Sequence, residues 1–247
     1  MRRIAVSLSK GGTGKTSTAI SLAHGLAMAG KKVLLVDTDT QGMVAPFLGI
    51  RAGAGLAELV SGEAKPEEAV IEARERLWIL SGGRGLAGVK RHITRQEIGG
   101  ERVLQEALDP IVARRYDYLL LDTAPGWDAL TIAALFCAHE VLAPVSLEVA
   151  SLLGLVEFMK SLEHIQKYHH LKLRYIVPTF LDGRVKKSEE ILAQLQAFYP
   201  GQLCHPIRYS VRLSECPGFG KTIHEYAPGS GASGDYESLT QRIIRDE

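Results

Sequence analysis

Short apolar runs alternate along the chain with longer segments in which apolar residues recur every three or four positions. The short runs have the length and composition of β-strands, and the longer segments have the periodicity of helices. This alternation predicts βαβ units, and therefore an α/β fold with a doubly wound, mostly parallel sheet and helices on both faces. The predicted strands are Ile4–Leu8, Lys32–Val36, Leu77–Leu80, Tyr118–Leu121, Glu140–Pro144 and Leu173–Pro178, and the predicted helices include Thr16–Ala29, Glu148–Tyr168 and Ser188–Phe198.

Two of the predicted strands are apolar at successive positions. Val33–Val36 and Tyr118–Leu121 show no alternation of polar and apolar residues, which is typical of central strands in a parallel sheet covered on both faces. No repeat, proline-rich linker or low-complexity tract divides the chain, although Gly229–Gly234 predicts a loop before a short amphipathic C-terminal helix. We therefore expect one domain over residues 1–247.

The composition narrows the classes of protein that fit. The chain has 247 residues, of which 46% are hydrophobic, so it can bury a full core. Its 29 Lys and Arg nearly balance its 28 Asp and Glu, so any contact with nucleic acid or acidic lipid needs a local patch. Cys137, Cys204 and Cys216 lack metal-ligand spacing, and no stretch approaches ~18 apolar residues. These features favour a cytoplasmic protein without a membrane span.

A glycine-rich loop, Ser9-Lys10-Gly11-Gly12-Thr13-Gly14-Lys15-Thr16, separates the first predicted strand from the first predicted helix. Backbone N–H groups of such a loop can surround a phosphate chain. Only Ser9, where glycine is usual, departs from the strict P-loop pattern. Lys15 is expected to neutralise the β- and γ-phosphates, and the Thr16 hydroxyl to bind Mg²⁺. The expected phosphate-binding residues are Lys10, Gly11, Gly12, Thr13, Gly14, Lys15, Thr16 and Ser17.

Aspartates stand at the carboxyl ends of two predicted strands. Asp37 and Asp39 follow one strand, and Asp122 ends another. Ligands of open α/β sheets bind at this edge. An aspartate near a γ-phosphate can hold Mg²⁺ through water or orient the attacking water. Three carboxylates beside one phosphate loop therefore indicate phosphoryl transfer.

Lys10 places a second lysine inside the loop. Two neighbouring ammonium groups are unfavourable unless several phosphate charges offset them. The run Lys-Gly-Gly-Thr-Gly-Lys-Thr at Lys10–Thr16 resembles the deviant Walker A motif of the ParA/MinD ATPases. The resemblance covers nearly the whole chain. It continues through Val33–Gly42, Tyr116–Pro125 and Val211–Ile223, where the sequence is similar to ParA/Soj rather than to MinD.

The resemblance implies roles for these residues in an ATP-sandwich dimer. Lys10 would reach the nucleotide of the other subunit, and Asp39 would position water in switch I. Asp37 would support the magnesium side, Asp122 would be the Walker B aspartate, and Thr123–Gly126 would form switch II. The resemblance thus implies ATP and Mg²⁺ as cofactors and Lys10, Lys15 and Asp39 as catalytic residues. Mg²⁺ would be held by Thr16 directly and by Asp39 and Asp122 through water.

The resemblance also implies where the base is held. The base would lie near Pro178 and Thr179, and near the loop before Arg212. Thr179–Asp182 has the frame of the guanine-recognition element but lacks its lysine, so ATP is expected rather than GTP.

Both switches differ from the family pattern. The family usually has proline where this chain has Thr40 in switch I and Ala124 in switch II. Losing proline loosens a loop without removing a phosphate ligand, so the hydrolysis rate is left open. Trp127, just after switch II, fits either the core or a dimer interface.

Basic residues gather in the C-terminal part of the chain. Six cations stand against Glu189, Glu190 and Glu215 in a nearly neutral protein, and on charge alone they fit a solvated face as well as a nucleic-acid site. The resemblance implies sequence-independent binding of double-stranded DNA by the dimer. The expected DNA contacts are Arg184, Lys186, Lys187, Arg208, Arg212 and Lys221.

A further basic cluster lies in the middle of the chain, with no acidic residue among its members. These cations either contribute to DNA binding or contact a partner protein, and the sequence does not decide between the two. The cluster consists of Arg84, Lys90, Arg91 and Arg95.

The resemblance implies a nucleoid-associated ATPase that segregates or positions plasmid, chromosome or protein cargo and is reset by hydrolysis. Hydrolysis would be slow and stimulated by a ParB-like or cargo-adaptor protein. The start at Met1 leaves no room for a helix-turn-helix extension. A MinD-like membrane-associated regulator and a metabolic P-loop ATPase are the alternatives. The acidic residues of Asp235–Glu247 disfavour a membrane helix, and Lys10 disfavours the metabolic enzyme.

Overall fold

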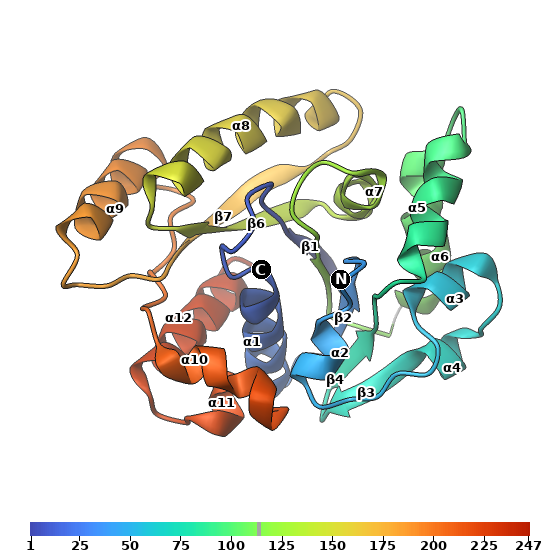
Figure 1. Cartoon of the computed structure of the whole chain (residues 1–247), viewed down its shortest axis with the longest axis horizontal. Helices are drawn as coiled ribbons and strands as arrows, with labels where there is room; N and C mark the ends of the chain where they lie inside the picture. Colours follow the sequence, from blue (N-terminus) through green and yellow to red (C-terminus); the bar gives the residue numbers. More distant parts are fainter. Residues whose placement is uncertain (113–114) are drawn as a thin grey trace.

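A seven-stranded sheet forms the centre of the computed structural model, which describes residues 1–112 and 115–247. The strand order is β3-β4-β2-β5-β1-β6-β7, and within the described residues only β3 and β4 pair antiparallel (Figure 1). This confirms the predicted α/β fold with a mostly parallel sheet. The strands are β1 (Arg2–Val6), β2 (Val33–Asp37), β3 (Val70–Arg74), β4 (Leu77–Leu80), β5 (Tyr118–Asp122), β6 (Glu140–Ser146) and β7 (Lys172–Thr179).

Strand β3 was not predicted from the sequence. Its residues are half-buried or exposed, and its register with β4 shifts between Glu72 and Arg74. A short, irregular strand at a sheet edge carries neither a continuous apolar run nor a clean alternation. A tight turn at Arg76, whose φ is 61°, joins it to β4. Strand β3 therefore forms because the hairpin turn brings it beside β4, and not because its own residues favour a strand.

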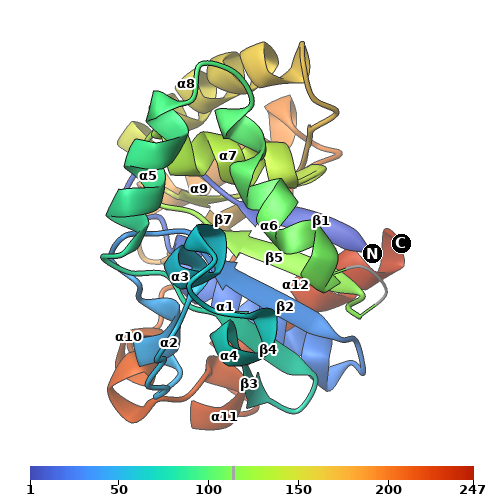
Figure 2. The same ribbon diagram turned by 90° about the vertical axis from the view of Figure 1, so that its right-hand side faces the viewer.

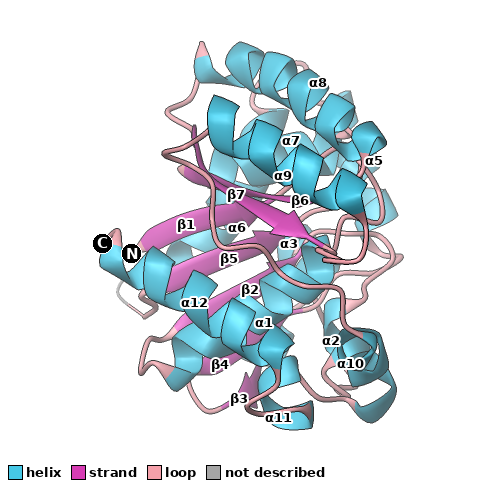
Figure 3. Cartoon of the chain, turned by 90° about the vertical axis from the view of Figure 1, so that its left-hand side faces the viewer, coloured by secondary structure: helices cyan, strands magenta, loops and turns pink. Residues whose placement is uncertain are grey.

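Helices cover both faces of the sheet, as Figures 2 and 3 show from two sides. None of the helices in the described residues has the length and apolar character needed to cross a membrane. The helices are α1 (Lys15–Met28), α2 (Val44–Phe47), α3 (Leu56–Ser61), α4 (Pro66–Ala69), α5 (Leu86–Arg95), α6 (Val103–Val112), α7 (Ala129–Cys137), α8 (Val149–Gln166), α9 (Lys186–Phe198), α10 (Val211–Glu215), α11 (Ile223–Tyr226) and α12 (Gly231–Arg245).

The core consists of two apolar layers, one on each face of the sheet. Strands β2 and β5 are buried along their whole length, as expected for central strands. Leu34 and Leu119 face the layer formed with α5 to α8, whereas Leu35 and Leu120 face the layer formed with α1 and α12. Alternate residues of one strand thus serve opposite layers.

The C-terminal helix packs directly on α1, the helix that follows the phosphate loop. Helix α12 begins at Gly231, inside the segment predicted as a loop, because the Ser230 hydroxyl accepts a hydrogen bond from the Ser233 N–H at 3.3 Å and caps the helix. Gly25 of α1 makes the close approach possible. A Cβ on Gly25 would lie 2.4 Å from Oγ1 of Thr240, whereas nothing lies within 4 Å of a Cβ on Gly234 of α12.

The same substitution should therefore have opposite effects at these two helical glycines. We expect Gly25→Ala to lower the free energy of unfolding by roughly 1–3 kcal/mol, because the methyl group forces α12 away from α1. Gly234→Ala should raise it by about 0.5–1 kcal/mol, because it removes only the conformational freedom of glycine in the unfolded chain. Urea unfolding of both variants measures the difference, and equal effects would contradict this packing.

Candidate nucleotide site

The phosphate loop lies at the carboxyl ends of the central strands, between β1 and α1. Gly12 and Gly14 have φ values of 74° and 83°, which side chains with a Cβ rarely adopt. Gly14 is also the residue immediately before α1, which starts at Lys15. The loop therefore presents its backbone and a helix N-terminus to the same space, while Gly11 and Gly12 are exposed.

Lys15 lies inside the loop and is only 7% exposed. Its Nζ donates a hydrogen bond to the carbonyl oxygen of Lys10 at 2.9 Å. Burial lowers the pKa of Lys15, and the nearby carboxylates of Asp122 and Asp39 oppose that shift. The ammonium group is thus held in place by the loop backbone, with anionic groups close to it.

Lys10 differs from Lys15 because its side chain is exposed. The chain after β6 passes beside it, and a Cβ on Gly154 of α8 would lie 3.4 Å from the Lys10 Cβ. Among the described residues, Lys10 has no ion-pair partner. Its ammonium group is therefore available to a ligand or another molecule, and its role across a dimer stays a prediction.

Asp122, at the end of β5, is 1% exposed, and the Thr16 side chain lies beside its carboxyl group. The pKa of Asp122 is raised well above the usual range by burial and by the neighbouring Asp37. Among the described residues, its Oδ1 has no hydrogen-bond partner. An unpartnered buried carboxylate oxygen next to a hydroxyl group is a set of hard oxygen donors that fits Mg²⁺ and its waters.

Asp37, unlike Asp122, has its carboxylate oxygens hydrogen-bonded by the backbone. It lies directly opposite Asp122 in the pairing of β2 with β5 and is fully buried. Its oxygens accept hydrogen bonds from the backbone N–H groups of Asp39 at 2.9 Å and Val44 at 3.0 Å. Burial raises the pKa of Asp37 to about 6. Asp37 therefore holds the loop that carries Asp39.

Asp39 is half-buried in the turn that follows β2. Its Oδ1 accepts the N–H of Gln41 at 2.9 Å, and its carbonyl oxygen accepts the N–H groups of Gly42 and Gly83, each at 3.0 Å. Thr40 is also half-buried. Since Gly83 follows β4, switch I is tied to the next strand of the sheet.

Switch II is attached to the phosphate loop. The Gly126 N–H donates to the carbonyl oxygen of Ser9 at 2.9 Å. Trp127 stacks on Phe158 of α8, with ring centroids 5.1 Å apart, so it packs against the core layer. Asp128 then caps α7 by accepting the Thr131 N–H at 2.9 Å.

A cavity of about 240 Å³ lies between the phosphate loop and the end of β7. The Thr179 hydroxyl donates to the Thr13 carbonyl oxygen at 3.0 Å and joins the two segments. Pro178 is buried, and its carbonyl oxygen accepts the Ile207 N–H at 2.8 Å. The cavity wall includes Gly14, Ser17, Thr179, Phe180, Tyr209, Ser210 and Tyr236.

Several of these wall residues were not predicted from the sequence. The position of Phe180, directly after Thr179 at the strand end, is a sequence signal that could have identified it. In the structure its φ is 58°, which is unusual for a residue with a side chain. Nothing in the sequence pattern marks Tyr209 or Tyr236, because the fold alone brings α10 and α12 to β7. The cavity has the size and the apolar walls that suit a planar base.

All six predicted DNA contacts are exposed, but the structure divides them into two groups. Arg184 pairs with Asp182 at 2.7 Å, Lys187 with Glu190 at 3.0 Å, and Arg208 with the buried Asp235 at 2.8 Å. Arg208 also lines the cavity beside Thr179. Of the six, Lys186, Arg212 and Lys221 have no ion pair within residues 1–112 and 115–247.

The chain has close relatives in sequence. The AAA domain family matches residues 1–175. The chromosome-partitioning ATPase Soj of Thermus thermophilus is 37% identical over 247 residues, which cover 99% of this chain and 96% of that protein. The chromosome partitioning protein ParA of Caulobacter vibrioides is 31% identical over 255 residues, which cover 100% of this chain and 95% of that protein.

A solved structure has the same fold. Cobyrinic acid a,c-diamide synthase from Mycobacterium smegmatis, with a bound ATP analogue and magnesium, aligns with a TM-score of 0.85 and 26% identity over 99% of this chain and 95% of that one. The fold alone therefore accommodates both partition proteins and metabolic enzymes. The sequence relatives separate these classes, and on that basis the chain belongs to the ParA/Soj family of chromosome-partitioning ATPases.

Proposed function

We propose that this chain, as a single ATPase domain, binds ATP with Mg²⁺, dimerises around the nucleotide and binds DNA as the dimer. Hydrolysis of ATP to ADP and phosphate then releases it. The observation that carries the proposal is the exposed Lys10 beside the buried Lys15, in a loop that faces the unpartnered oxygen of Asp122. In a chain 37% identical to Soj, this combination favours a nucleotide shared between two subunits.

Thr16 and Asp122 are the residues that would hold Mg²⁺, the hydroxyl directly and the carboxylate through water. When bound, the ion offsets charge on the phosphates during transfer. The Lys15 ammonium neutralises phosphate oxygens and is already held near them by the Lys10 carbonyl. Loop N–H groups and the α1 N-terminus orient the phosphate chain.

Asp39 orients the attacking water. Its position depends on Asp37, which accepts the Asp39 N–H, and on Gly83, which donates to the Asp39 carbonyl oxygen. The turn is thus fixed at its backbone while the carboxylate reaches toward the phosphate side. Catalysis of phosphoryl transfer consists mostly of such positioning.

We further propose that the dimer binds duplex DNA without sequence preference and works on the nucleoid with a ParB-like or cargo-adaptor protein. The unpaired Lys186, Arg212 and Lys221 support this assignment more strongly than Arg208, which is engaged by Asp235. Two copies of a modest patch on one dimer add their phosphate contacts in a single binding event. Helix α12 packs its apolar side on α1, so this helix does not offer that side to a membrane.

Asp39→Ala should separate nucleotide binding from hydrolysis. We expect single-turnover hydrolysis to fall about 100-fold, because the water loses its orienting carboxylate while Lys15 and Asp122 remain. ATP affinity should change little, and the ATP-bound dimer should accumulate. Asp39→Asn is the matched control for turn geometry, because its amide oxygen still accepts the Gln41 N–H. Wild-type hydrolysis by Asp39→Asn would show that the carboxylate charge is not what orients the water.

Lys10→Ala should impair dimerisation rather than nucleotide binding. Lys10 is exposed, so its removal leaves the loop that surrounds the phosphates in place. We expect sedimentation with ATP to show a monomer for Lys10→Ala and a dimer for wild type, with hydrolysis reduced about tenfold or more. Lys167→Ala, an exposed lysine after α8, is the control. A Lys10→Ala variant as dimeric as wild type would overturn the role of Lys10 in the dimer.

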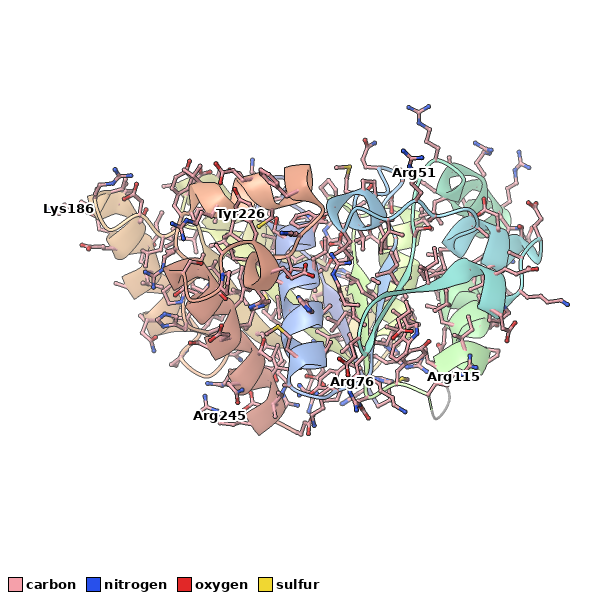
Figure 4. All side chains as sticks on the ribbon, turned by 90° about the horizontal axis from the view of Figure 1, so that it is seen from below. Arg51, Arg76, Arg115, Lys186, Tyr226 and Arg245 are labelled. Carbon is pink, nitrogen blue, oxygen red and sulfur yellow. The ribbon has the colours of Figure 1, made fainter. Side chains whose placement is uncertain are left out.

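Arg212→Glu should abolish DNA binding while ATP-driven dimerisation continues. Lys186→Glu and Lys187→Glu should act in the same direction more weakly. In the two weaker variants, losing one phosphate contact per subunit should reduce the slope of log affinity against log salt by about two in a dimer. Arg245→Glu on α12 is the matched control, since Figure 4 shows Arg245 and Lys186 at different edges of the molecule. Binding to random duplexes with ATP, ADP or no nucleotide tests this, and full binding by Arg212→Glu would refute it.

A further inference from the structure

A basic groove of about 630 Å³ runs between α5 and the switch I turn. Helix α5 supplies one wall, and the residues directly after Asp39 supply the other. In Figure 1 this helix stands at the side of the molecule opposite α9. The residues that matter here are Thr40, Gln41, Arg84, Lys90, Arg91 and Arg95.

The charge of the groove favours an anionic ligand. Four of its lining residues are cations, and none is acidic. Arg84, Arg91 and Arg95 are exposed and have no ion pair within the described residues. The opposite face of α5 is buried in the core layer, so the helix that carries the cations is rigidly mounted. An anionic ligand would meet a preformed set of charges.

The groove is joined to switch I through the backbone. Gly83, in the loop that leads into α5, donates its N–H to the Asp39 carbonyl oxygen at 3.0 Å. The fit there is tight, because a Cβ on Gly82 would lie 2.6 Å from the same carbonyl oxygen. A ligand that moves Thr40, Gln41 or the start of α5 therefore acts on the turn that holds Asp39.

The groove is also joined to the segment after switch II. Lys90 Nζ lies 2.9 Å from Asp128 Oδ2, and Asp128 caps α7 immediately after Trp127. The Lys90 side chain is 43% exposed, so an incoming carboxylate can compete with Asp128 for it. The loop before α5 thus contacts the switch I turn, and α5 contacts the segment that follows switch II, both from outside the nucleotide site.

We propose that this groove docks an acidic segment of a partner protein and that docking is transmitted to both switch segments. Helix α5 has ten residues and is about 15 Å long, which matches an extended segment of about five acidic residues. Lys90 exchanges Asp128 for a carboxylate of the partner, and the remaining arginines hold the segment along the helix. Docking requires no nucleotide and goes beyond the proposed ATPase cycle.

Protein carboxylates fit the groove better than DNA phosphates do. The cations line a recess one helix long, which individual side chains can enter, whereas duplex DNA is a stiff rod that meets a surface from outside. The groove follows β4, whereas Arg184, Lys186 and Lys187 follow β7 at the opposite edge of the sheet. Lys221 lies elsewhere, next to Gly220, whose carbonyl oxygen accepts a hydrogen bond from Arg74 of β3 at 2.8 Å. The groove is therefore separate from the cations around α9.

The docking test uses a fluorescein-labelled peptide of about eight alternating Asp and Glu residues, titrated into the full chain without nucleotide at about 50 mM salt. A peptide with Asn and Gln in their place is the neutral probe, and binding of a random duplex by the same variants is measured separately with ATP. The variant is Arg91→Glu with Arg95→Glu. The control is Lys160→Glu with Lys167→Glu, two exposed positions at the far end of α8 that change the net charge equally.

Wild type and the control should bind the acidic peptide alike, and the groove variant should bind it about tenfold or more weakly. The neutral peptide should not bind. Equal weakening in both variants would reduce the effect to net charge and overturn the proposal. Loss of duplex binding with unchanged peptide binding in the groove variant would make the groove a DNA site. Matching urea midpoints exclude loss of folding as the cause.

Transmission to switch II is measured with Trp127 as the single tryptophan, in a Trp78→Phe background. The acidic peptide should change the Trp127 emission, because Lys90 leaves Asp128 beside it. Lys90→Met should remove this change and weaken peptide binding only about threefold, as expected for one partly exposed charge. Peptide binding with unchanged Trp127 emission in the Lys90-containing protein would overturn the transmission step.

Discussion

The register between β2 and β5 places Asp37 beside Asp122, and much of the site depends on how these two buried carboxylates are satisfied. Burial raises the pKa of both carboxyl groups, and the neighbouring Asp37 raises the pKa of Asp122 further. Asp37 is satisfied by backbone N–H groups of the loop that follows β2. Asp122 keeps an unpartnered oxygen within the described structure, and this asymmetry supports the proposal that Asp122, rather than Asp37, serves Mg²⁺.

The hydrogen bonds of Asp37 have a second effect, because they fix the start of switch I. The Asp39 carbonyl oxygen is then bound by Gly42 and Gly83, so the turn is held from β2 and from the loop after β4. Switch II is held by Gly126, whose N–H donates to Ser9 in the phosphate loop. Backbone hydrogen bonds on either side thus restrain the segments that contain Thr40 and Ala124.

The basic residues form two groups. One group follows β7 in the sequence and extends from α9 through α10 to Lys221, beside the Gly220 carbonyl oxygen that Arg74 of β3 binds, and the other lies on α5 and directly before it. Ion pairs with Asp182, Glu190 and Asp235 already engage half of the first group. The second group keeps three exposed arginines without a partner in the described residues. Gly83, directly before it, binds the switch I turn, and Lys90 pairs with Asp128 after switch II. Counting charges along the sequence does not distinguish cations that are engaged in ion pairs from cations that are free to bind a ligand.

The sequence by itself determined the six parallel strands, the phosphate loop and the carboxylates at the strand ends, because each depends on a local pattern. Continuous apolar runs identify strands buried on both faces, and a loop between such a strand and a helix carries its motif within eight residues. Tertiary structure decided what depends on packing and register. It paired Asp37 with Asp122, formed the edge strand β3, and brought Phe180, Tyr209 and Tyr236 around one cavity. It also engaged Arg208 with Asp235 and left the arginines of α5 unpaired within the described chain, because contacts between residues distant in the sequence form only when the sheet and its covering helices assemble.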